Sequence, residues 1–168
     1  MEEFLIVDGY NIIGALKSSQ TEEISLEESR QWLVDKLANY QGYTGVVVYV
    51  VFDAHLAPGP GQQMKERGVQ VIYTKERETA DERIERLVRE LRKEGRRIMV
   101  ATSDHTEQRV IFGEGALRQS ARELLQALEA VEKKINQKIE SQYRNKGMGP
   151  LPLREDIAEL FEKWRRGR

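Results

Sequence analysis

The chain has 168 residues, of which 39% are hydrophobic and 33% are charged, and these values fit one ordinary globular domain and exclude a disordered protein. It contains no cysteine and two histidines, which excludes disulfides, thiol nucleophiles and a well-liganded tetrahedral zinc site. The acidic start Met1-Glu2-Glu3 and the short longest apolar run, VVVYVVF, are not those of a signal peptide or a membrane span. We therefore expect a soluble, cytoplasmic protein with no membrane partner.

The net charge of −1 hides an asymmetry along the chain. Residues 1–82 carry 7 basic and 14 acidic side chains, and residues 83–168 carry 20 basic and 14 acidic ones, which gives net charges of −7 and +6. Such a division suits an acidic pocket beside a basic surface that grips a polyanion. Solvated helix faces would give the same numbers, and charge alone leaves both interpretations open.

Short apolar segments alternate with amphipathic ones along the chain. The apolar segments lack a polar face, as is typical of parallel strands that are buried on both sides. Four of them predict strands, at residues 4–8, 46–53, 69–74 and 97–103. With helices between them, the order predicts an α/β fold with a mostly parallel sheet.

Two amphipathic segments between these strands predict helices. The first covers residues 26–40, has apolar residues at helical spacing, and is expected to end near Gly42. The second begins after Thr79, whose hydroxyl is a suitable N-cap with Glu82 as its capping-box partner. The connection 54–68 is rich in turn residues, which fits either a mobile substrate flap or a plain connector.

The C-terminal part is expected to be mostly helical. Residues 116–119 predict a fifth short strand, and Ser120 with Glu123 predicts a capping box at the start of a helix from about 121 to 143. The apolar residues of this helix keep helical spacing, so it can pack on its own sheet or pair with a partner helix. We favour packing on the sheet, because a single domain needs that cover.

Aspartates lie at or just beyond the ends of three predicted strands. Asp8 follows FLIV, Asp53 follows VVVYVVF and Asp104 follows IMVATS, while Asp81 begins the helix after the remaining strand. The carboxyl ends of parallel strands form one edge of the sheet, and ligands bind there where the strand order reverses. One such aspartate is more often a cap or turn residue, but four at one edge predict a shared site.

The expected cluster of carboxylates predicts a metal site, because close carboxylates repel one another unless a cation neutralises them. Oxygen donors without histidine or cysteine suit Mg²⁺ or Mn²⁺. The matching chemistry is phosphodiester hydrolysis, in which one metal lowers the pKa of an attacking water and a second stabilises the leaving oxygen. Gly9 permits a sharp exit or the close approach of a phosphate. Asn11 presents an amide that orients a water or phosphate, or it is the N-cap of a helix opening at Ile12.

Four motifs in order, LIVDGYN, VVFDA, TADE and ATSD, followed by GALRQSARELL, resemble the YacP-like group of NYN-domain proteins, relatives of the PIN-domain ribonucleases. The resemblance implies a PIN-like three-layer α/β/α sandwich with strand order 3-2-1-4-5 and metal-dependent endoribonuclease activity. It also implies messenger RNA and the translating ribosome as partners. The family's acidic-site positions fall on Asp8, Asn11, Asp53, Asp81 and Asp104. Asp8, Asp81 and Asp104 are then the metal ligands, and Asp53 can belong to the outer shell.

Basic residues gather in two places, around the helix after Asp81 and near the C-terminus. Those of the helix have acidic neighbours three or four residues away, such as Glu82 for Arg86, so intrahelical pairs are the simpler account for them. Basic side chains bind phosphates with little sequence information. We expect the C-terminal cluster to bind RNA, through Arg144, Lys146, Arg154, Arg165 and Arg166.

The chain is expected to be a single domain over residues 1–168, with 144–168 a basic helical extension, and a monomer is favoured. The main hypothesis is a Mg²⁺- or Mn²⁺-dependent endoribonuclease. A non-catalytic RNA- or ribosome-binding module is the alternative, although an idle site has no need to keep mutually repelling carboxylates. A doubly wound aspartate-dependent phosphatase is a further alternative, but its second acid, two residues after the first, is replaced by Tyr10.

Overall fold

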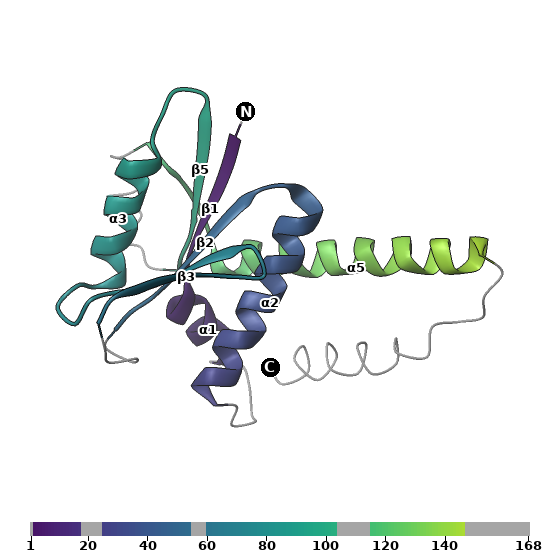
Figure 1. Cartoon of the computed structure of the whole chain (residues 1–168), viewed down its shortest axis with the longest axis horizontal. Coiled ribbons are helices and arrows are strands. Elements are labelled where there is room, and N and C mark those ends of the chain that lie inside the picture. Colours follow the sequence, from purple (N-terminus) through teal and green to yellow (C-terminus); the bar gives the residue numbers. More distant parts are fainter. Residues whose placement is uncertain (1, 18–24, 55–59, 104–114, 147–168) are drawn as a thin grey trace.

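The computed structural model describes residues 2–17, 25–54, 60–103 and 115–146, and its centre is one six-stranded sheet (Figure 1). The spatial order is β3-β4-β2-β1-β5-β6. Every neighbouring pair is parallel except β3 with β4. The strands are β1 (Glu2–Asp8), β2 (Val47–Phe52), β3 (Gln62–Glu66), β4 (Val69–Tyr73), β5 (Arg96–Ala101) and β6 (Leu117–Gln119).

The five parallel strands lie in the order β4-β2-β1-β5-β6. Counted along the chain without β3, this is the order 3-2-1-4-5 that the resemblance implies, which is thereby confirmed. From β1 the chain adds β2 and β4 on one side and then returns to add β5 and β6 on the other. The order therefore reverses at β1, and parallel sheets bind ligands at the carboxyl edge beside such a reversal.

The connection 54–68 was expected to be a flap or a plain connector. Part of it instead forms β3, an antiparallel strand at the edge of the sheet. Glu66 pairs with Val69, so Arg67 and Gly68 alone make the turn to β4. Both have positive φ angles, 49° and 91°, as a two-residue hairpin turn that matches strand twist requires. The strand was missed because its sequence, QQMKE, is polar and exposed, and its pairing with β4 forms it.

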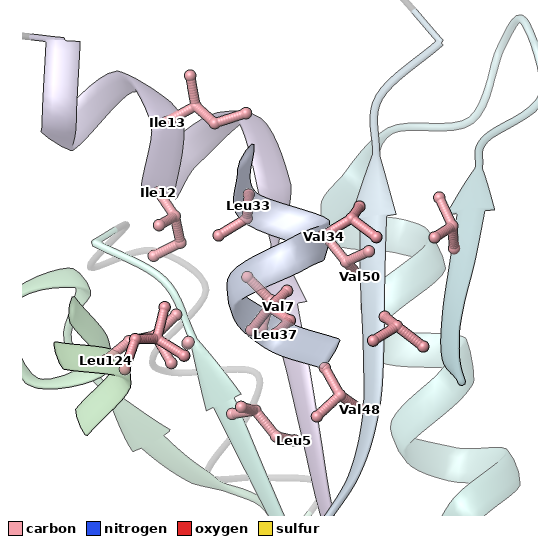
Figure 2. Close-up of a cluster of buried hydrophobic side chains, with 14 of the residues drawn as sticks. Leu5, Val7, Ile12, Ile13, Leu33, Val34, Leu37, Val48, Val50 and Leu124 are labelled. Carbon is pink, nitrogen blue, oxygen red and sulfur yellow. The ribbon is translucent and has the colours of Figure 1, made fainter. Parts of the chain in front are cut away.

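Helices cover both faces of the sheet and make the three layers that the resemblance implies (Figure 1). On one face, α1 (Gly9–Lys17), α2 (Leu26–Thr44) and α5 (Ala121–Asn145) surround a buried cluster (Figure 2). On the other face, α3 (Ala80–Leu91) buries the apolar stripe expected of it. Alternate residues of β1 divide between the two faces: Leu5 and Val7 join the first cluster, and Phe4 and Ile6 join the second.

The helix starts are formed as the sequence predicts. The hydroxyls of Thr79 and Ser120 accept hydrogen bonds from the backbone amides of Glu82 and Glu123, each at 3.1 Å, which satisfies an amide that has no intrahelical partner. Helix α2 ends at Thr44, two residues beyond Gly42, and Gly45 caps it in the left-handed conformation with a φ of 79°.

Among the described residues, helix α5 packs on the rest of the fold through its first half. Leu124 and Leu128 join the cluster on the α2 face, and Val131 is also buried, whereas Ile139 is 43% exposed. The buried carboxylate of Glu132 accepts hydrogen bonds from Lys36 at 3.2 Å and from Asn39 at 2.7 Å on α2. None of the helices in the described ranges is long and apolar enough to cross a membrane.

Replacing Lys36 with Met should lower the free energy of unfolding by about 3 kcal/mol, because it leaves the Glu132 charge buried without its cation. Replacing both residues, as Lys36→Met with Glu132→Leu, should recover most of that loss. Urea unfolding followed by circular dichroism measures both effects. Lys133→Met is the control on the exposed side of α5. Equal losses for Lys36→Met and Lys133→Met would show that the ion pair has no special role.

Candidate active site

Three of the predicted aspartates lie at the carboxyl edge of the sheet on the α3 face. Side chains alternate between faces along a strand, so Asp8, after Ile6, is directed to the face that α3 covers. Val51 packs on the α3 face, and Asp53 follows it two residues later. Asp8 lies opposite Val51 in the pairing of β1 with β2. Asp81 is the second residue of α3 itself.

Asp53 is tied directly to the start of α3. One carboxylate oxygen accepts a hydrogen bond from the backbone amide of Ala80 at 3.2 Å. A carboxylate is favourable at a helix N-terminus, where backbone amides are free and the helix dipole is positive. The contact fixes Asp81, the next residue, relative to the end of β2. It supports the outer-shell interpretation of Asp53.

Asn11 joins the start of α1 to the segment that follows β5. Its amide oxygen accepts hydrogen bonds from the backbone amide of Ser103 at 2.6 Å and from the Ser103 hydroxyl at 2.8 Å. The N-cap interpretation was wrong, because α1 begins at Gly9 and Asn11 lies inside its first turn. The amide instead holds the residue that precedes Asp104, across the point where the strand order reverses.

Gly9 is required by an aromatic ring. A Cβ atom at this position would overlap the ring of Phe52, which is fully buried at the end of β2. Only glycine lets α1 begin directly after Asp8 against that ring. The ring of Tyr10 then packs on Phe52 with centroids 5.0 Å apart. Gly9 therefore admits a close side chain of the core, and the expected approach of a phosphate at this residue stays a prediction.

The described chain contains only part of the predicted metal set. Asp8 is 7% exposed, and Asp53 and Asp81 are half-buried. Within residues 2–17, 25–54, 60–103 and 115–146, no three histidine, cysteine or acidic side chains form a group that could hold a metal ion. Asp104 lies outside these ranges, so the set of Asp8, Asp81 and Asp104 remains a prediction. The oxygen-only donors fit a hard divalent cation.

Basic residues on and near α3 have acidic partners. Arg86 contacts Glu78 at 3.1 Å and Glu90 at 3.8 Å, in place of the expected Glu82.

Arg144 pairs with Glu140 at 2.9 Å in the last turns of α5, and Lys146 is exposed just after it. The other members of the predicted RNA-binding cluster lie outside the described residues: Arg154, Arg165 and Arg166.

Sequence reasoning assigned no role to several polar residues at this edge. Buried Thr74 accepts a hydrogen bond from the amide of Ala54 at 2.7 Å, and it thereby joins the chain just beyond the ends of β2 and β4. Ser103 belongs to the ATSD motif, which pointed only to its aspartate. Arg30, on α2, donates to the Tyr10 hydroxyl at 2.9 Å. Contacts between distant segments leave no local pattern that would have revealed them.

Comparison with known proteins connects this edge to a family. The family model described as the YacP-like NYN domain matches residues 5–166. The chain belongs to the YacP-like NYN-domain family. Over 168 residues it is 50% identical to YacP of Bacillus subtilis (strain 168), and the match covers 98% of each chain.

Two solved structures agree with this assignment. The crystal structure of Rae1 (YacP) from Bacillus subtilis is 51% identical to this chain, with a TM-score of 0.75 over 98% of this chain and 95% of that one. The crystal structure of its W164L mutant is 48% identical, with a TM-score of 0.71 over 98% and 96%. NYN domains are a PIN-like nuclease family, which makes the aspartates at the carboxyl edge the candidate nuclease site.

Replacing Gly9 with Ala should lower the free energy of unfolding by about 1–3 kcal/mol, because the new methyl group forces the Phe52 ring or α1 to move. Gly14→Ala is the matched control in the same helix, since a methyl group added there would meet no other atom within 4 Å. That control should stabilise the protein by up to about 1 kcal/mol through helix propensity. Urea denaturation of the two variants compares them, and the same sign of change in both would contradict the close-packing argument.

Proposed function

We propose that this YacP-like NYN protein is a divalent-metal-dependent endoribonuclease. Three aspartates at the carboxyl edge of the sheet on the side of α3, in a chain of a nuclease family, support the proposal. Asp8, Asp81 and Asp104 would hold Mg²⁺ or Mn²⁺. The cation would lower the pKa of a water and neutralise charge on the phosphate.

The chain's own residues would divide the remaining tasks. Asp53 would hold the start of α3, and with it Asp81, through the Ala80 amide. Asn11 would hold Ser103, and with it the next residue, Asp104. Both are positioning roles, because each residue acts through a neighbour in the chain. Precise placement of ligands by such surrounding contacts commonly changes metal affinity or activity by about 10- to 100-fold.

The proposed substrate is messenger RNA, with the translating ribosome as the setting in which the protein meets it. This part rests on the family resemblance. The exposed basic end of α5, with Arg144 and Lys146, supports phosphate binding. Base contacts or a partner that presents the message would supply cleavage specificity, since phosphate contacts carry little sequence information.

Replacing Asp8 or Asp81 with Asn should lower the rate of RNA cleavage in Mn²⁺ by more than about 100-fold, because each change removes a charged metal ligand. Cleavage of a labelled structured RNA, and then of messenger RNA on translating ribosomes, measures the rate. Circular dichroism checks that both variants fold. Either variant cutting at the parental rate would disprove the proposed role of its aspartate. A parent that binds RNA but never cuts it would favour the binding-module alternative.

Asp53 offers a sharper comparison between ligand and positioning roles. Asp53→Asn keeps an oxygen that can accept from the Ala80 amide, so we expect a loss of cleavage of about tenfold or less. Asp53→Ala removes that acceptor and should lose more activity together with about 1 kcal/mol of stability. If Asp53→Asn were as inactive as Asp8→Asn, Asp53 would have to be counted as a metal ligand.

A further inference from the structure

Arg30 is a half-buried cation in an unusual setting at the carboxyl edge. It lies near the start of α2, and its guanidinium donates to the Tyr10 hydroxyl at 2.9 Å. It also lies close enough to Tyr73, the last residue of β4, to lower the pKa of that phenol, although burial has the larger effect and raises the pKa overall. Among the described residues, the Tyr10 phenol is therefore the hydrogen-bond partner of this guanidinium, and the Tyr73 phenol lies near it.

Several other cations among the described residues are paired with carboxylates. Lys36 contacts Glu132, Arg86 contacts Glu78, and further pairs involve Arg67, Arg83, Arg96, Arg97 and Arg144. No carboxylate in the described ranges lies within 4.0 Å of the Arg30 guanidinium. A guanidinium taken partly out of water without a counter-charge is costly unless an anion pairs with it. Its fork of donors matches a phosphate.

An aromatic cluster holds Arg30 and Tyr10 in place. Phe52 packs on Tyr10 with ring centroids 5.0 Å apart and on Tyr73 at 5.5 Å. The Tyr10 oxygen accepts from Arg30, so the hydroxyl hydrogen of Tyr10 remains able to donate elsewhere. The cluster thus presents a phenol donor and the remaining guanidinium donors together. Tyr10 is separated from Asp8 by one residue in the chain, so this group lies at the same end of β1 as Asp8.

We propose that Arg30 and Tyr10 form a phosphate subsite for single-stranded RNA, which holds a backbone phosphate beside the bond that is cut at the aspartates. This inference rests on the proposed function. The strand would cross the carboxyl edge from the α2 side, where Arg30 lies, to the α3 side, where Asp8 and Asp81 lie (Figure 1). The subsite would orient the strand without reading its sequence.

RNA binding without cleavage tests the subsite. The probe is a fluorescent oligouridylate of about ten nucleotides, a length typical of single-strand sites, in EDTA, with affinity measured by anisotropy across a range of salt concentrations. Arg30→Gln should weaken binding about tenfold and reduce the slope of log K against log salt by about 0.7, the value for one phosphate contact on a single strand. Tyr10→Phe should weaken binding about threefold without changing the slope, because no charge is lost.

Arg97→Gln is the matched control. It removes the same charge from an exposed residue at the opposite, amino end of β5, and it should change neither affinity nor slope. If Arg30→Gln behaves like Arg97→Gln, or if the parent does not bind the RNA, the subsite is wrong. If Arg30→Gln fails to fold, Tyr10→Phe decides, because it keeps the packed ring, and unchanged affinity then overturns the proposal.

Cleavage in Mn²⁺ separates this inference from the proposed function. If the parent binds RNA through Arg30 but does not cut it, the subsite is supported and the proposed nuclease function is wrong. If the parent cuts RNA while Arg30→Gln changes neither affinity nor slope, the nuclease function is supported and the subsite is wrong.

Discussion

Strand β1 pairs with a parallel neighbour on each side, and both of its faces are buried under helices. A slip of one residue in either pairing would turn every side chain of the strand to the wrong face. The register is therefore fixed, and so is the face to which Asp8 is directed. Since the strand order also reverses here, the end of this one strand sets both the position and the orientation of the candidate site.

Polar contacts then join the segments that surround that strand end. Asp53 holds the start of α3, and Asn11 holds Ser103 beyond β5. A hydrogen bond of this kind contributes only about 1 kcal/mol to stability, far less than the burial of the two apolar clusters. Its importance lies in geometry, because each contact places the residue next to a predicted metal ligand. Packing makes the fold, and these few polar contacts arrange its edge.

Residues at the end of β1 contribute to both faces of the sheet. Gly9 allows the Phe52 ring to lie against the start of α1, and Tyr10 packs on that ring. Asp8 is directed to the α3 face, while Phe52 belongs to the cluster on the α2 face. The Asp8 carboxylate and the Arg30 guanidinium are thus kept on opposite sides of the sheet edge. A polyanionic strand crossing this edge would meet Arg30 on one side and the carboxylates on the other.

The sequence by itself determined the parallel strands, the capped helix starts and the aspartates at strand ends, because each depends on residues near one another along the chain. The tertiary structure alone decided the edge strand β3, the link from Asn11 to Ser103 and the contact of Arg30 with the Tyr10 phenol. The strand β3 forms by pairing with β4 although its own sequence is polar, and the other two contacts join segments distant in sequence. A short sequence pattern carries no record of such contacts.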